Sequence, residues 1–160
     1  MMTNSGRMFA ISRRSLLKLT ASLSAAFAFP GHVWAKFNRP EAAFGATELD
    51  KTLEALGGTP EISQGIYFFT PDIAENGAVV PVRVEVDAEQ IPNVNKVYLL
   101  VEQNPNPMAA VFDVPSGTEV YLETRVKVAQ TSELYAVVEA KGQLFMQSKE
   151  TKVTLGGCGG

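Results

Sequence analysis

The chain has 160 residues, with 14 basic residues, 17 acidic residues, one histidine and one cysteine. An acidic balance disfavours nucleic acid as a partner, because nucleic acid is bound through basic groups that neutralise phosphates. A single cysteine also excludes an internal disulfide framework.

The N-terminal segment has the pattern of an export signal. Ser12-Arg13-Arg14-Ser15-Leu16-Leu17-Lys18 has the form of a twin-arginine motif, an apolar run covers residues 19–29, and Val33-Trp34-Ala35 offers a small-residue cleavage site. The apolar run is shorter than the roughly 20 residues that cross a bilayer. We expect residues 1–35 to be a twin-arginine signal peptide that is cleaved after Ala35, leaving a periplasmic protein with no membrane attachment.

Cleavage after Ala35 changes the chemistry of the chain. It leaves 125 residues, enough for one ordinary domain, and reduces 14 basic residues to ten against 17 acidic ones, a formal charge of −7. The only histidine, His32, is lost as well. The mature chain therefore cannot form a Cys-His pair, a Ser-His-Asp triad or a His-based metal site.

One short helix is predicted near the start of the mature chain. Residues 36–46 contain Pro40 and Gly45 among small residues and are expected to be a flexible leader before the first regular element. Thr47-Glu48-Leu49-Asp50 has the form of a capping box, leucines 49, 53 and 56 have helical spacing, and Gly57-Gly58 supplies a stop.

The rest of the chain is predicted to form about seven strands. Apolar and polar residues alternate over 80–87 and 120–128, which indicates half-buried strands. Further strands are expected at 66–69, 97–101, 134–140, 143–148 and 150–155, with turns at Asn76-Gly77 and Lys141-Gly142. This pattern favours an all-β, antiparallel, immunoglobulin-like sandwich over residues 47–155, although the Cys-Trp-Cys core of antibody domains is absent.

Acidic residues give no sign of catalysis. Glu85, Asp87, Glu119 and Glu123 lie on the polar faces of predicted strands, where a solvated surface is the ordinary state, so we assign them no acid or base role. The loop Asn104–Pro107 fits either a partner surface or an ordinary turn with prolines.

The last five residues, Gly156-Gly157-Cys158-Gly159-Gly160, predict an accessible thiol on a mobile arm. Glycines on both sides gain little from packing and lose much entropy when ordered, and Cys158 reaches roughly 10 Å beyond Leu155. Lys152 is the nearest basic residue in sequence, so activation of the thiol is expected to come from the pocket of a partner enzyme.

The terminal Val153-Thr154-Leu155-Gly156-Gly157-Cys158-Gly159-Gly160 resembles the carrier arm of the SoxY family, the sulfur-carrying subunits of periplasmic thiosulfate-oxidising systems. Residues 71–77, 104–107, 124–127 and 135–138 are similar to that family as well. The resemblance implies a tight heterodimer with SoxZ and a non-catalytic carrier that has no cofactor. It also implies that SoxXA, a haem c enzyme, joins thiosulfate to Cys158, that SoxB hydrolyses off sulfate, and that a sulfane dehydrogenase, where present, oxidises the remainder.

Two other hypotheses for the function of the C-terminal residues remain open at this point. One is an exported β-sandwich interaction module that dimerises through a Cys158–Cys158 bridge. The other is a donor that activates the Gly160 carboxylate, as ubiquitin-like sulfur carriers do, although that chemistry needs ATP, which is not available outside the cytoplasm.

Overall fold

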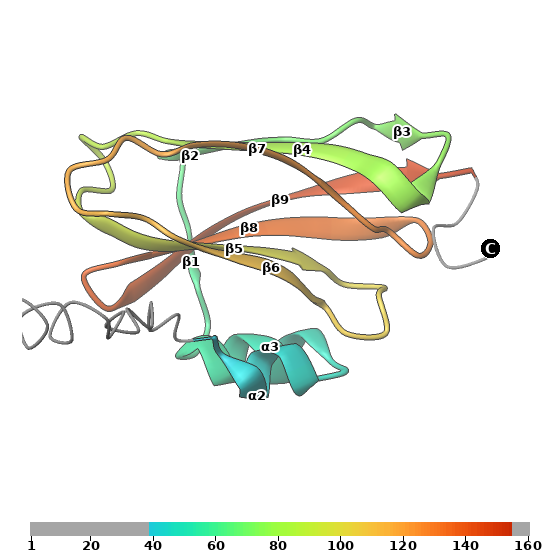
Figure 1. Ribbon diagram of the computed structural model, residues 1–160, viewed down its shortest axis with the longest axis horizontal. Helices are drawn as coiled ribbons and strands as arrows, with labels where there is room; N and C mark the ends of the chain where they lie inside the picture. Colours follow the sequence, from blue (N-terminus) through green and yellow to red (C-terminus); the bar gives the residue numbers. More distant parts are fainter. Residues whose placement is uncertain (1–38, 155–160) are drawn as a thin grey trace, which may run out of the picture. The chain divides into compact units, whose positions relative to one another are not determined.

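The computed structural model describes residues 39–154, which form three layers (Figure 1). A three-stranded sheet packs on a six-stranded sheet, and two short helices cover the other face of the larger sheet. The smaller sheet consists of β2 (Ile66–Phe69), β4 (Val80–Val86) and β7 (Tyr121–Val126). The larger sheet consists of β1 (Glu61–Ile62), β3 (Ile73–Ala74), β5 (Val94–Val101), β6 (Met108–Asp113), β8 (Ser132–Ala140) and β9 (Gln143–Val153).

The strand order is that of an immunoglobulin-like sandwich. The small sheet runs β2-β4-β7 and the large one β6-β5-β8-β9, and every pair among these seven strands is antiparallel. Among the strands that the structure describes, only the two-residue strands β1 and β3 pair in parallel, both with β9. The predicted all-β, immunoglobulin-like fold is therefore confirmed.

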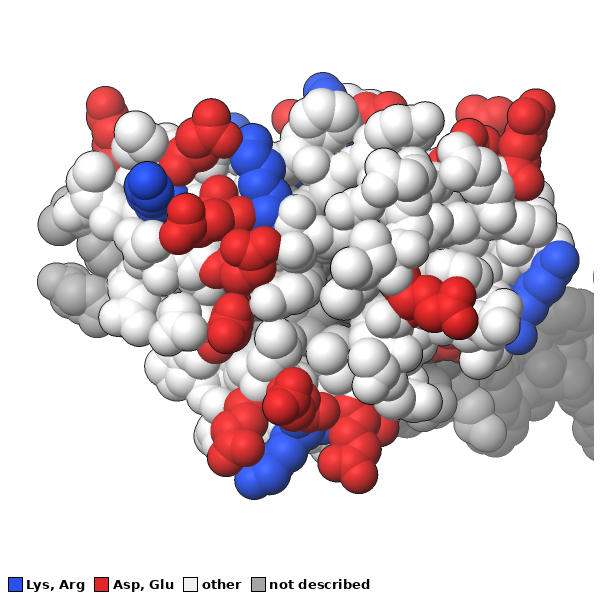
Figure 2. Space-filling model, turned by 180° about the vertical axis from the view of Figure 1, so that it is seen from behind, with Lys and Arg blue, Asp and Glu red and all other residues white. Residues whose placement is uncertain are grey.

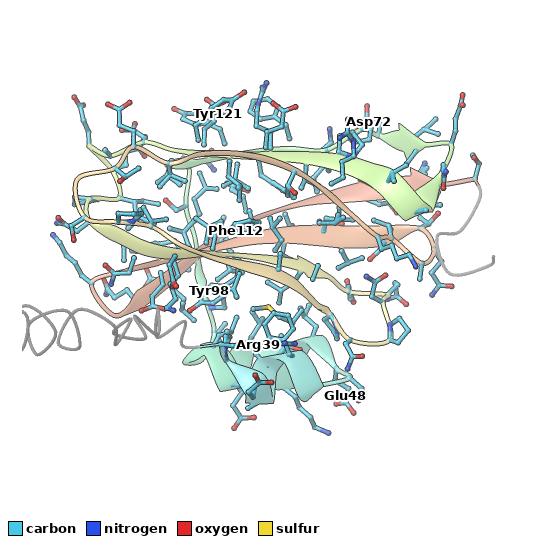
Figure 3. The ribbon with its side chains drawn as sticks, in the orientation of Figure 1. Arg39, Glu48, Asp72, Tyr98, Phe112 and Tyr121 are labelled. Atoms are coloured by element: carbon cyan, nitrogen blue, oxygen red, sulfur yellow. The ribbon has the colours of Figure 1, made fainter. Side chains whose placement is uncertain are left out.

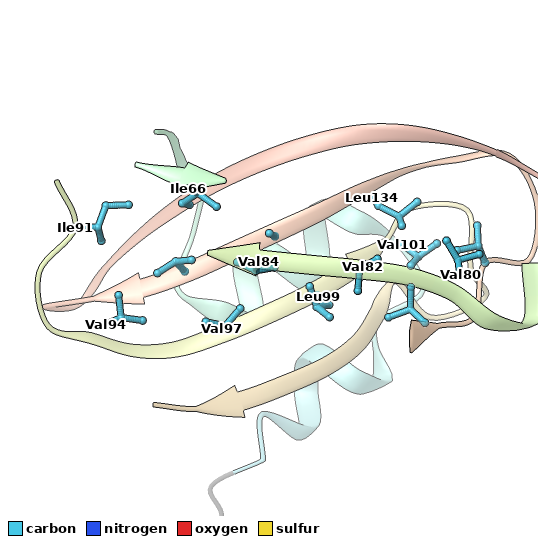
Figure 4. Packing of buried hydrophobic residues seen from close by; sticks show 14 of the residues in the cluster. Ile66, Val80, Val82, Val84, Ile91, Val94, Val97, Leu99, Val101 and Leu134 are labelled. Atoms are coloured by element: carbon cyan, nitrogen blue, oxygen red, sulfur yellow. The ribbon is translucent and has the colours of Figure 1, made fainter. Parts of the chain in front are cut away.

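The main core lies between the two sheets, where alternation along the strands sends every second side chain inward (Figure 4). Val80, Val82 and Val84 of β4 face the large sheet, and Val97 and Leu99 of β5 face back. Each is buried, and full burial of such a side chain stabilises a fold by about 1.5–3 kcal/mol. The alternation predicted at 80–87 and 120–128 thus corresponds to β4 and β7, two neighbouring strands of the small sheet.

Helix α3 (Leu49–Leu56) confirms the helix predicted from leucine spacing. Leu49, Leu53 and Leu56 pack against a second apolar cluster on the outer face of the large sheet, which includes Tyr98 (Figure 3). The predicted stop is also present, because the Gly57 N–H donates to the carbonyl oxygens of Glu54 and Leu53 at a φ of 131°. Packing of this amphipathic face, more than local propensity, holds so short a helix.

The predicted capping box is wrong. The N-cap residue is Glu48 rather than Thr47, and no side chain caps the helix. The Thr52 hydroxyl instead donates to the Glu48 carbonyl oxygen at 2.9 Å, and Lys51 pairs with the Glu48 carboxylate at 3.2 Å. The docking of the leucine face sets where the helix begins, one residue later than the local motif indicates.

A second helix, α2 (Glu41–Gly45), corrects the expectation of a leader without regular structure over 36–46. Ala43 is completely buried, Phe44 packs into the outer cluster, and the Arg39 guanidinium lies 4.1 Å from the centre of the Phe44 ring. Tertiary contacts therefore order a segment whose small residues gave no helical pattern.

The loop at 104–107 makes structural bonds. The Asn104 amide donates to the Lys127 carbonyl oxygen at 2.9 Å and accepts from the Ala129 N–H at 2.9 Å. The Asn106 amide donates to the Ala46 carbonyl oxygen at 3.1 Å, and Pro107 is fully buried. These contacts make the loop a structured turn that joins both sheets and the leader.

The predicted signal peptide, residues 1–35, lies outside the described residues, as do Cys158 and glycines 156, 157, 159 and 160. Over residues 39–154, no helix has the length and apolar character needed to cross a membrane.

Candidate functional site

The described chain ends at Thr154, four residues before Cys158. The part of the site that the structure shows is therefore the base of the arm, where β9 finishes. Two partners flank this strand end: β8 pairs with it through Ser132 and Thr151, and β3 pairs through Ile73 with Lys152 and Ala74 with Val153.

Hydrogen bonds continue to the last described residue. The Lys152 N–H donates to the Asp72 carbonyl oxygen at 2.9 Å, and the Thr154 N–H donates to the Ala74 carbonyl oxygen at 3.1 Å. The Thr154 hydroxyl donates to the Glu75 carbonyl oxygen at 3.1 Å. On the other side, the Val153 N–H donates to the Thr131 hydroxyl at 3.1 Å. The arm therefore starts from a fixed point rather than from a fraying strand.

Side chains reinforce the same strand end. The hydroxyls of Thr70 and Thr151 are buried and lie 2.8 Å apart. The Lys149 ammonium group donates to the Thr70 carbonyl oxygen at 2.8 Å and lies 2.8 Å from the Asp72 carboxylate. The hydrogen bond from Lys149, together with its charge, lowers the pKa of Asp72 below its ordinary value, although that carboxylate is fully exposed. Segment 70–75 thus clamps the last six described residues, 149–154, which are the end of β9 and Thr154.

This geometry limits where the thiol can act. Four residues at about 3.3–3.6 Å each place the Cys158 Cα no more than about 14 Å from the Thr154 Cα. Figure 2 shows acidic and basic side chains interspersed toward the end of the molecule where β9 finishes.

The acidic residues given no catalytic role have surface contacts. Glu85 lies 3.0 Å from the Arg83 guanidinium, which also sits 4.2 Å from the centre of the Phe69 ring. Glu123 accepts from the hydroxyl of Tyr121, on the outer face of the small sheet (Figure 3). Asp87 accepts from the Gln90 amide and the Glu89 N–H, bonds that lower its pKa. Between residues 39 and 154, no group of three or more His, Cys, Asp or Glu side chains is placed to hold a metal ion.

Sequence reasoning missed the base of the arm. The segment 70–75 has no alternation and no chemical motif, and its two-residue strand exists only because β9 lies beside it. The one available signal was the pattern Pro71–Gly77, which resembled a family segment without indicating its place in space.

The comparisons with known proteins cover both the fold and the arm. The family model for sulfur oxidation protein SoxY matches residues 53–158, so the match extends to Cys158 itself. A search of curated proteins found no match, whereas 12 chains of solved structures match. One is the sulfur carrier protein SoxY from Chlorobium limicola f thiosulfatophilum, 36% identical, with a TM-score of 0.58 over 68% of this chain and 97% of that one. A family match over most of the domain, agreeing with a solved relative of the same family, shows that this chain belongs to the SoxY family.

Proposed function

We propose that this protein is a sulfur carrier that holds thiosulfate-derived intermediates covalently on Cys158. The observation that carries the proposal is the family match, which runs through the domain and ends on the chain's only cysteine. The solved relative at 36% identity is described as a sulfur carrier. A strand end fixed four residues before Cys158 fits this role, because it gives the segment that carries the thiol a defined point of attachment.

The proposed loading step is a two-electron oxidation. The Cys158 thiolate and the outer sulfur of thiosulfate form a disulfide bond, giving Cys158–S–S–SO3⁻ and releasing two electrons. A haem c enzyme of the SoxXA kind accepts these electrons one at a time. Because a free cysteine has a pKa near 8.5, the enzyme's pocket must favour the thiolate.

The proposed unloading step is a hydrolysis. Water attacks the terminal sulfone sulfur, giving sulfate, two protons and a persulfide anion, Cys158–S–S⁻, that stays on the carrier. A hydrolase of the SoxB kind carries out this step, and a sulfane dehydrogenase, where one is present, oxidises the persulfide sulfur. The carrier supplies no catalytic group of its own. It raises the effective concentration of each intermediate at successive active sites by tethering it.

We further propose that the protein works in the periplasm as a heterodimer with a SoxZ-like subunit. The twin-arginine pattern at Arg13-Arg14 supports export. Family membership supports the subunit partner, because the family is expected to function within the Sox system.

The test is the intact mass of the protein after incubation with thiosulfate and the haem c enzyme. The proposal predicts that the wild-type protein gains the mass of one S2O3 group and that the gain is lost on reduction. Cys158→Ser is the matched control, since it replaces sulfur by oxygen and changes nothing else. An unchanged wild-type mass, or an equal gain on the serine variant, would refute the proposal.

A further inference from the structure

Two large apolar side chains are exposed beside the strand end from which the arm starts. Ile73 in β3 is 61% exposed, and Val79, the last residue of the 3-10 helix η1 (Gly77–Val79), is 53% exposed. Between them in sequence lie Ala74 and Glu75, whose carbonyl oxygens accept the two hydrogen bonds from Thr154. Single exposed apolar residues are common on protein surfaces, so exposure alone does not indicate a function for these two. Their location beside the strand end is what indicates one.

The length of the tether brings any enzyme close to this place. The four residues from Thr154 to Cys158 span no more than about 14 Å. A pocket that encloses Cys158 and the two glycines before it takes up about 10 Å of that span. Roughly 4 Å then remain between the mouth of the pocket and Thr154, a distance at which side chains touch. An enzyme whose pocket encloses Cys158 and the two glycines before it must therefore contact the surface around Thr154.

Ile73 and Val79 lie within that contact zone. Ile73 is paired with Lys152, so a strand spacing of about 4.8 Å and two residues along β9 put its Cα roughly 8 Å from that of Thr154. The Val79 backbone nitrogen lies 3.5 Å from the Asn76 carbonyl oxygen, which keeps Val79 one 3-10 turn from Asn76, the residue that follows Glu75. Figure 1 shows β3, the start of β4 and the end of β9 at the same end of the molecule.

We infer that Ile73 and Val79 form an apolar docking contact, here named the root collar, for the mouths of the enzyme pockets that receive Cys158. The partner surface that fits the root collar is an apolar rim around a pocket that binds a sulfur-linked anion. This inference rests on the proposed carrier function. Two side chains cover far less than the roughly 800 Å² per partner of a stable complex, so the contact is transient. A carrier that must leave each enzyme for the next requires such weak docking.

The chain contains a matched control for the root collar. Ile62 is also an isoleucine in a two-residue strand that pairs in parallel with β9, and it is 73% exposed. Its partner on β9 is Met146, six residues before Lys152, which places it about 20 Å from the position of Ile73 along the strand. Ile62 is thus equally apolar and exposed but lies beyond the region that a docked pocket mouth covers.

The experiment compares Ile73→Thr/Val79→Thr with Ile62→Thr in the complete mature protein with its subunit partner. Threonine keeps the β-branch and both sites are exposed, so the urea concentration at the midpoint of unfolding is expected to stay close to that of the wild type. The first readout is the kcat/KM of the haem c enzyme for the carrier protein, measured as loading of Cys158 in the presence of thiosulfate. The second is the rate at which iodoacetamide alkylates Cys158, which needs no docking.

We expect Ile73→Thr/Val79→Thr to lower kcat/KM at least tenfold, through a higher KM for the carrier protein. The alkylation rate of Cys158 should not change in this variant. In Ile62→Thr, kcat/KM should stay within twofold of the wild-type value. If the double variant unfolds, the two single variants still provide the test, because each is expected to lower kcat/KM about threefold. Equal kcat/KM in all variants, or an equal loss in Ile62→Thr, would overturn the root collar while leaving the carrier function intact. A wild-type protein that gains no adduct at all would overturn both.

Discussion

At the scale of single residues, the outer cluster contains two tyrosines whose hydroxyls meet carboxylates. The Tyr98 hydroxyl donates to Glu139 at 2.6 Å, and the Tyr135 hydroxyl donates to Glu102 at 3.2 Å. Burial first, and then the neighbouring carboxylates, raise the pKa of both phenols. Both residues therefore resist ionisation in the folded protein.

The pKa of Tyr135, raised to about 12, gives a prediction for alkaline pH. The main cause is burial, followed by Glu102, with smaller effects from Glu133 and Asp50. Because the folded pKa exceeds the ordinary value of about 10, the contribution to stability is complete below about pH 10 and is lost as pH rises through the folded value.

At about pH 11 the folded wild type and Tyr135→Phe should therefore show nearly the same tyrosinate absorbance, because Tyr135 is still protonated there. In urea at the same pH, the variant should lack the absorbance of one tyrosinate. A full tyrosinate lost from the folded variant would contradict the assignment.

The buried hydroxyls of Thr70 and Thr151 give a second prediction at this scale. Thr151→Val leaves the Thr70 hydroxyl buried without this partner and is expected to lower the free energy of unfolding by about 1–3 kcal/mol. Thr70→Val/Thr151→Val removes both polar groups, so it should destabilise less than either single variant. Urea unfolding of the three variants checks this, and strictly additive losses would show that the hydroxyls are not coupled.

At the scale of elements, the β8–β9 hairpin sets the register of the strand that ends at the arm. Its two-residue loop has φ values of 52° at Lys141 and 77° at Gly142, as the predicted tight turn requires. Apart from its two chain neighbours, no residue in the range 39–154 has an atom within 4 Å of where a Cβ on Gly142 would stand, so a side chain there meets conformational strain without a clash.

We predict that Gly142→Ala lowers the free energy of unfolding by about 1–2 kcal/mol, the effect of forcing a left-handed conformation on a residue with a Cβ. Gly45→Ala is the control, because Gly45 ends α2 without a positive φ and has equally open space around it. It should change stability by less than about 0.5 kcal/mol. Equal effects of the two substitutions, measured by urea unfolding, would argue against strain in the hairpin loop.

The sequence predicted six of the nine described strands and missed β1, β3 and β6. The valines of β4 alternate with polar residues because one face of that strand is buried and the other faces solvent. The local sequence pattern therefore predicts which face packs in the core. Strand β6 was not predicted, because most of Met108–Asp113 is half-buried and the segment alternates poorly. Strands β1 and β3 are two residues long and exist through β9 alone, which no local signal can show.

The candidate site also contains features that the sequence predicts and features that only the fold shows. Cys158 and its glycines could be identified directly, since their chemistry depends on residue type and terminal position. The clamp by segment 70–75 could not, because its hydrogen bonds join residues about 80 positions apart in the chain. The candidate thiol could thus be proposed from the sequence, whereas the surface at the base of its segment required the fold.

At the scale of the whole molecule, the compartment of the protein can be tested through the twin arginines. Arg13→Lys/Arg14→Lys keeps the positive charge but removes the guanidinium pair of the proposed signal. We predict that this variant stays in the cytoplasm at full length, while the wild-type protein appears in the periplasm with an N-terminus after Ala35. Cell fractionation with N-terminal sequencing decides, and export of the lysine variant would contradict the proposal.

The central claim, that Cys158 carries inorganic sulfur between enzymes, is tested most directly on the native protein from cells oxidising thiosulfate. Mass spectrometry of the C-terminal peptide should find Cys158 bearing thiosulfate-derived groups, including a persulfide, that reduction removes. A C-terminal peptide that holds only a free thiol, or only a Cys158–Cys158 bridge, throughout active thiosulfate oxidation would contradict the account.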